Sequence, residues 1–154
     1  MGRAEIAYSQ DEVEWLISCI EKLKPFPDVV ESLEALKNLY RLCILSNGDR
    51  DMLETAKKYI GFNFDLTISV QEAGAFKPDR RTYAEAENII HQKFGEIERS
   101  GILFVANHAF DCIGAKAYGF RSVFIDRRKR PFGESPFQPD LIVENFDELA
   151  DLLT

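Results

Sequence analysis

The chain has few cysteines and no long apolar run. Its three cysteines, Cys19, Cys43 and Cys112, are odd in number and show no CxxC spacing, which is typical of reduced thiols in a cytosolic protein. No apolar run approaches the roughly 20 residues that span a bilayer. The first fifteen residues are polar and acidic, unlike a secretion signal. We therefore expect a cytoplasmic protein with no membrane anchor.

The chain also lacks an excess of positive charge. Nineteen Lys and Arg against 26 Asp and Glu leave a net charge of −7 over 154 residues. A protein of this sign repels phosphate backbones and acidic lipid surfaces, so neither nucleic acid nor a membrane is expected as a partner. Any small anion must be held by local donors. The length favours one compact domain.

Apolar strand patterns alternate with helical patterns along the chain. We expect strands at 41–46, 64–70, 102–106, 122–125 and 141–143, and helices at 9–23, 27–39, 49–60, 79–94, 108–118 and 146–153. The runs 41–46 and 102–106 are apolar on both faces, as in strands inside a parallel sheet, whereas 64–70 alternates like a half-exposed strand near an edge. The alternation predicts a doubly wound, parallel α/β sheet with ligands at the carboxyl ends of its strands.

Three polar groups follow this pattern at positions that can face one ligand. Ser46 ends one strand, Lys77 precedes Pro78, and Asp111 lies one turn into a helix after the strand 102–106. A hydroxyl, an ammonium and a carboxylate at one sheet edge predict a site for a small anion. Each residue also has an ordinary explanation: Ser46 as a helix cap, Lys77 as a surface lysine, and Asp111 as a favourable charge in the first turn of a helix.

Two neighbours of these groups are weaker candidates. Tyr83 follows Lys77 by six residues and can point its phenol at the same anion, although its place on an apolar helix face favours core packing. His108 titrates near neutrality, but an exposed imidazole at a helix start usually has no role. The basic run 127–130, beside a proline-rich loop, is typical of solvated charge.

Taken together, the segments resemble the haloacid dehalogenase (HAD) superfamily, and within it the type II 2-haloacid dehalogenases and their fungal-like relatives. The resemblance covers nearly the whole chain and rests on the order and spacing of short motifs. These are Pro25-Phe-Pro-Asp28, Ile44-Leu-Ser-Asn-Gly48, Phe76-Lys-Pro-Asp79 with Tyr83, Phe104-Val with Asp111, Gly114-Ala-Lys116, Gly119-Phe-Arg121 and Pro139-Asp140-Leu141.

The resemblance implies a Rossmann-like core beneath a helical cap and a set of site residues. In such enzymes an aspartate on the first strand attacks the carbon that bears the halogen, and water hydrolyses the resulting ester. By position Lys77, Asp111 and Ser46 are the catalytic residues, and the substrate is bound by Asn47, Tyr83, Asn107 and His108. The expected ligand is a small carboxylate or similar anion, and no cofactor or metal is expected. Mg²⁺ belongs only to a phosphatase-like alternative, which the neutral Asn107 disfavours.

The chain departs from the family pattern most at its N-terminal end. No apolar strand with a nucleophilic aspartate precedes the second helix, and nothing between Met1 and Pro25 replaces it. We expect 1–25 to be a remnant of the cap and 26–154 a partial core. In the family that strand lies between the strands at 41–46 and 101–106, so these two must pair directly, accept a strand from another chain, or leave backbone groups unsatisfied. Ala106 and His108 also differ from the residues common in bacterial type II enzymes.

Three hypotheses follow. The first is a domain of the 2-haloacid dehalogenase lineage that is inactive as this chain, because the nucleophile is absent. The second is a non-catalytic remnant that binds a small anion or a protein through exposed strand edges. The third and weakest is a phosphatase-like enzyme completed by a separate chain. A homodimer is possible, since dimers are common among similar enzymes.

Overall fold

The computed structural model describes residues 7–154, so the first six residues of the expected cap remnant 1–25 lie outside the described residues. The helices are α1 (Gln10–Glu21), α2 (Val29–Lys37), α3 (Arg50–Ile60), α4 (Arg80–Phe94), α5 (Ala109–Tyr118) and α6 (Phe146–Leu153), with a short 3₁₀ turn at Arg99–Gly101. The strands are β1 (Cys43–Ser46), β2 (Leu66–Ser69), β3 (Leu103–Ala106), β4 (Arg121–Ile125) and β5 (Leu141–Val143). Every expected element is present, within a few residues of its expected bounds.

The helix ends follow from local chemistry. Ser9 and Glu12 form a reciprocal capping box at the start of α1, and the Asp49 carboxylate accepts a hydrogen bond from Met52 N at the start of α3. Gly61 and Gly119 end α3 and α5 with φ angles of 74° and 114°, which only glycine adopts without strain. The sequence pattern therefore placed these ends correctly.

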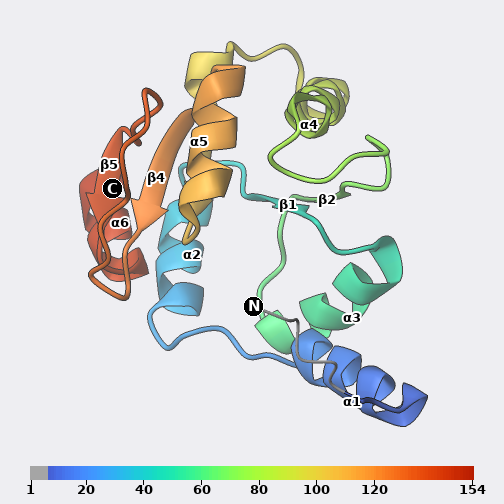
Figure 1. Ribbon diagram of the computed structural model, residues 1–154. Helices are drawn as coiled ribbons and strands as arrows, with labels where there is room; N and C mark the ends of the chain where they lie inside the picture. Colours follow the sequence, from blue (N-terminus) through green and yellow to red (C-terminus); the bar gives the residue numbers. More distant parts are fainter. Residues whose placement is uncertain (1–6) are drawn as a thin grey trace.

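All strand pairs are parallel, as expected for this α/β class, but they form two separate sheets. β1 pairs with β2, while β3, β4 and β5 form a second sheet in that order. Figure 1 shows β4 and β5 together with α6 on one side of the molecule and β1 with β2 near its middle. Among the residues that the structure describes, β1 and β3 have no strand pairing with each other, so each leaves one edge free.

The strands differ in burial because they differ in the number of neighbouring strands. β4 has a strand on both sides, and its residues from Ser122 to Ile125 are all buried. In β1, Cys43 is exposed and Ile44 to Ser46 are only half-buried. The expectation that 41–46 and 102–106 lie inside a sheet is therefore wrong for this chain, because β1 and β3 each have one neighbouring strand and are not enclosed at the other edge.

Two apolar clusters form the core. One consists of Tyr83, Ala115, Tyr118 and Phe120, and joins α4 to α5. The other consists of Val123, Ile125, Val143 and Leu149, and joins the second sheet to α6. The aromatic rings of the first cluster contact edge to face or stacked at 5.0 to 6.2 Å between centroids. The first cluster holds α4 and α5 in fixed positions, and both helices begin beside candidate site residues.

Helix α1 packs on α3, and Figure 1 shows the two side by side, away from α6. The helix itself agrees with the expected one, but most of its apolar side chains are exposed, including Trp15, Leu16, Ile17 and Ile20. An apolar helix face without a covering layer is costly in water. Of the helices described, none has the length and apolar character needed to cross a membrane.

Candidate active site

Lys77 and Asp111 form the centre of the candidate site. Their Nζ and Oδ1 atoms lie 3.1 Å apart, and each side chain is only 11% exposed. Asp111 Oδ1 is buried and has no aligned hydrogen-bond partner among residues 7–154. The ion pair with Lys77 is therefore the one polar contact of this atom within that range. A lysine ammonium has three donors. The pair therefore presents a positive group that can bind a further anion and a carboxylate that can accept a proton.

Asn47 connects the end of β1 to Lys77. Its Oδ1 accepts a hydrogen bond from Lys77 N at 2.8 Å, and its Nδ2 donates to Lys77 O at 3.4 Å. We call these two hydrogen bonds the clamp. The loop after β1, the segment at Lys77 and the first turn of α5 therefore meet at one place. This confirms the expectation that these separate segments converge, whereas binding of substrate by Asn47 stays a prediction.

Ser46 ends β1 next to this clamp and is half-buried. Its Oγ accepts a hydrogen bond from Gly48 N at 3.1 Å, while α3 is capped by Asp49 and not by Ser46. The ordinary explanation of Ser46 as the cap of the next helix is therefore wrong. Its hydroxyl donates no hydrogen bond within the described part of the chain, which leaves a donor for a ligand.

Tyr83 is completely buried in the core cluster, and its hydroxyl donates to the Asp111 carbonyl at 3.2 Å. Burial, followed by the nearby Asp111 carboxylate, raises the pKa of this phenol. Gly114 allows the close approach, because a Cβ there would lie 2.7 Å from Pro78 Cβ and would also meet the Tyr83 hydroxyl. The packing role that the apolar helix face favoured is confirmed; a contact of Tyr83 with substrate stays a prediction.

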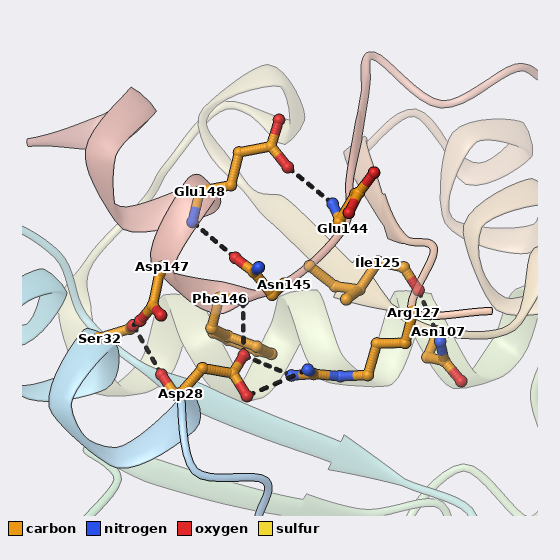
Figure 2. Close-up of polar contacts among 10 residues, drawn as sticks. All are labelled: Asp28, Ser32, Asn107, Ile125, Arg127, Glu144, Asn145, Phe146, Asp147 and Glu148. Atoms are coloured by element: carbon orange, nitrogen blue, oxygen red, sulfur yellow. Dashed lines mark hydrogen bonds and ion pairs between the residues drawn. The ribbon is translucent and has the colours of Figure 1, made fainter. Parts of the chain in front are cut away.

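Asn107 and His108 follow β3. The Asn107 Nδ2 donates to the carbonyl of Ile125 at the end of β4, as Figure 2 shows. His108 is exposed at the start of α5, makes no capping hydrogen bond, and tilts against Phe110 at 5.7 Å between ring centroids. Within the described part of the chain, neither side chain forms a hydrogen bond or ion pair with the side chain of Lys77 or Asp111, so their binding roles stay predictions.

The sequence did not predict the largely buried ion pair between Arg127 and Asp28. Arg127 binds Asp28 through two hydrogen bonds of 3.0 and 2.6 Å, and Asp28 also accepts from Phe146 N at 2.8 Å (Figure 2). The assignment of Arg127 to a solvated run is wrong, because its side chain is only 19% exposed and its guanidinium stacks over Phe26. The segment Pro25-Phe-Pro-Asp28 was the signal that could have predicted this contact, since it contains Phe26 and Asp28, the two residues that the Arg127 guanidinium contacts.

The pKa of Asp28 reflects two opposing effects. Burial disfavours its charged form, but the hydrogen bonds from Arg127 and Phe146 outweigh burial and lower the pKa. Asp28 is thus held as a carboxylate that joins the start of α2 to the end of β4 and the start of α6. This network fixes the point at which α1 and its linker leave the core.

A hollow of about 330 Å³ lies beside Asn47, lined also by Asp49, Val70, Gln71, Gly74, Ala75 and Phe76. Phe76 is 68% exposed at its rim, directly before Lys77. The hollow provides space next to the clamp for a small ligand. Among the described residues, no group of three or more His, Cys, Asp or Glu side chains is arranged to hold a metal ion.

The family model described as haloacid dehalogenase-like hydrolase matches residues 2–119, which is most of the chain. The chain belongs to this family. The resemblance found from the motifs is thereby confirmed, as is the HAD-type α/β fold.

Curated relatives agree with this membership. An (S)-2-haloacid dehalogenase of Pseudomonas sp. strain YL is 36% identical over 134 residues, which are 85% of this chain and 56% of that protein. Haloacetate dehalogenase H-2 of Moraxella sp. strain B is 37% identical over 135 residues, with 86% and 58% covered. The chain thus spans little more than half the length of these relatives and belongs to the 2-haloacid dehalogenase lineage.

Solved structures show the same relation. The L-2-haloacid dehalogenase RSc1362 aligns with a TM-score of 0.87 at 28% identity, covering 98% of this chain and 66% of that one. The L-2-haloacid dehalogenase of Xanthobacter autotrophicus with chloropropionic acid covalently bound aligns with a TM-score of 0.82 at 26% identity, covering 96% and 68%. Nearly all of the present fold is therefore shared with longer dehalogenases.

Proposed function

We propose that the protein to which this chain corresponds hydrolyses the carbon–halogen bond of short 2-haloacids, with Lys77, Asp111 and Ser46 supplied by this chain and the nucleophile by a segment outside it. The observation that carries this proposal is the shielded Lys77–Asp111 ion pair at 3.1 Å, next to which Asn47, directly after β1, bonds the main chain of Lys77. The dehalogenase lineage of the relatives supports the substrate class, and so does the covalently bound chloropropionic acid of the Xanthobacter autotrophicus structure.

The residues have distinct roles in this proposal. A carboxylate from a segment outside this chain attacks the carbon that bears the halogen, forming a carbon–oxygen ester bond while the halide leaves with the bonding electrons. The Lys77 ammonium orients that carboxylate and offsets its charge, and the Ser46 hydroxyl and nearby N–H groups hold the carboxylate of the substrate. Asp111 accepts a proton from the water that then hydrolyses the ester, releasing a 2-hydroxy acid. No cofactor takes part.

The two free strand edges indicate where a strand that carries the nucleophile would lie. β1 and β3 each lack a partner on one side within the described chain, and both are apolar strands that are only half-buried. A parallel strand placed between them would join the two sheets, cover both edges and bring its carboxyl end to Lys77. We propose that α1, together with the rest of residues 1–25, is what this chain retains of the helical cap, and that the whole protein is cytoplasmic.

A chimaera tests this function. We would fuse the N-terminal part of the strain YL enzyme that lies outside the matched region ahead of Tyr8, and measure halide release from (S)-2-chloropropionate. The 154-residue chain alone should release no halide, whereas the chimaera should release it and lose this activity in Lys77→Met and Asp111→Asn. The matched control Lys93→Met changes an exposed lysine of α4 and should keep the activity. A folded chimaera without activity, or halide release by the chain alone, would contradict the proposal.

A second candidate function is favoured by the same free edges. Exposed parallel edges bind extended segments through main-chain hydrogen bonds, so the isolated chain would bind a strand from another protein or a second copy of itself without catalysis. Sedimentation of the purified chain at increasing concentration separates these cases from a monomer. A strictly monomeric chain that also fails to bind small carboxylates would remove this candidate.

A further inference from the structure

We propose that Asn47 is a positioning residue: it fixes the main chain at Lys77 so that the Lys77 ammonium stays against Asp111. Sequence reasoning gave Asn47 a substrate-binding role, but the carboxamide is already engaged on both sides of the Lys77 residue. The placement of Lys77 follows from the structure alone. Its consequence for catalysis rests on the proposed function.

The contact itself is the first argument. Asn47 lies directly after β1 and bonds the N–H and the carbonyl of a residue 30 positions later. Of the side chains in the described range 7–154, no other one bonds the main chain of Lys77. The clamp therefore connects the carboxyl end of β1 to the segment that carries the lysine. A substitution that removes it frees that segment without deleting any charged group.

The partner of Lys77 is fixed independently. The Tyr83 hydroxyl binds the Asp111 carbonyl at 3.2 Å from inside the core, and Asp111 N donates to the His108 carbonyl at 3.1 Å. Asp111 is therefore held by its main chain, while its Oδ1 atom has no aligned hydrogen bond. The ion pair of 3.1 Å thus depends on where the main chain places its two members. On the Lys77 side, Asn47 sets that position.

Nuclear magnetic resonance of the ¹⁵N-labelled chain tests the clamp without any reaction. In Asn47→Ala we expect hydrogen exchange of the Lys77 amide to become about tenfold faster, because the loss of one hydrogen bond corresponds to roughly that factor. The Lys77 ammonium signal, assigned through its loss in Lys77→Arg, should shift and exchange faster with solvent. Asn88→Ala, at an exposed asparagine of α4, is the matched control and should change neither signal.

A conservative variant separates positioning from general destabilisation. Asn47→Asp keeps an oxygen that accepts from Lys77 N but loses the donor to the carbonyl, so the amide should stay protected within about threefold of the wild type. This comparison also serves if the alanine variant does not fold. The inference is overturned if Asn47→Ala leaves the Lys77 amide and ammonium unchanged, or if Asn47→Asp exposes the amide.

The chimaera provides the catalytic readout. There Asn47→Ala should lower kcat by about 10²-fold, because misplacement of a catalytic group by about 1 Å has an effect of this size, and should change KM for (S)-2-chloropropionate by less than about threefold. A substrate-binding role predicts the opposite division between the two constants. If the chimaera with Asn47 intact has no activity, the proposed function fails, while the resonance experiment still decides the clamp.

Discussion

The two sheets are built from similar sequence but differ in enclosure. β4 lies between β3 and β5, and Val123 at its centre is 0% exposed. β1 is equally apolar and also parallel, yet it pairs with β2 alone and stays half-buried. An apolar pattern therefore shows which residues a strand can bury, whereas the neighbouring strands decide whether those residues are buried.

The largest effect should come from matched substitutions in neighbouring strands. Val123→Ala in β4 removes a fully buried side chain, and we expect a loss of about 2–3 kcal/mol in the free energy of unfolding. Val105→Ala in β3 removes the same groups from a half-buried position, so about 1 kcal/mol is expected. Urea unfolding measures both. Equal losses would show that β3 is as well enclosed as β4.

A smaller effect should arise where the core reaches the site. Gly114→Ala places a methyl group 2.7 Å from Pro78 Cβ and against the Tyr83 hydroxyl, so overpacking should lower the unfolding free energy by about 1–3 kcal/mol. In Gly101→Ala the added group meets only the Ile97 Cγ2 methyl group, at 3.0 Å. That control should be close to the wild type, and a well-tolerated Gly114→Ala would show that this contact is loose.

The Asp28 network should contribute about as much to stability. Arg127→Ala removes two hydrogen bonds from a carboxylate that is 13% exposed, and about 1–3 kcal/mol should be lost. Lys129→Ala breaks the exposed pair with Glu144 and should cost at most about 1 kcal/mol. Thermal unfolding of both variants checks this difference. Similar melting temperatures would mean that Arg127 behaves as a solvated residue after all.

The smallest effect concerns pH. The folded state lowers the pKa of Asp28, so this carboxylate contributes stability above its unfolded pKa of about 3.9, and the contribution is lost as pH falls through the lower folded value. The stability difference between the wild type and Asp28→Asn should therefore be greatest near pH 6 and shrink below about pH 4. Urea titrations from pH 2.5 to 7 measure it, and a difference that is independent of pH would contradict this role.

Local sequence signals predicted the elements well. The capping box at Ser9, the glycines at 61 and 119, and the alternation of apolar runs are local, so they placed helices and strands without tertiary information. The convergence of Lys77 and Asp111 also followed, because carboxyl ends of parallel strands share an edge. These features depend on short stretches of chain or on a general rule of topology.

Features that depend on distant partners were not predictable. The resemblance assigns Asn47 to the substrate, and nothing in its own segment shows that it also bonds the main chain of Lys77. Arg127 was assigned to solvent because its partner Asp28 lies 99 residues away. The exposure of α1 and of the β1 edge likewise reflects what packs beside them, which a pattern of apolar residues does not contain.

Residue-resolved hydrogen exchange on the chain and on the chimaera tests most directly whether the two sheets become one continuous sheet when the added strand lies between β1 and β3. In the chain alone, the amides of β1 and β3 that do not bond to β2 or β4 should exchange rapidly, while those of β4 are protected. In the chimaera the same β1 and β3 amides should become as protected as β4. Protection of both edges already in the chain alone, or no gain in the chimaera, would contradict the joining of the sheets by a strand that brings the nucleophile.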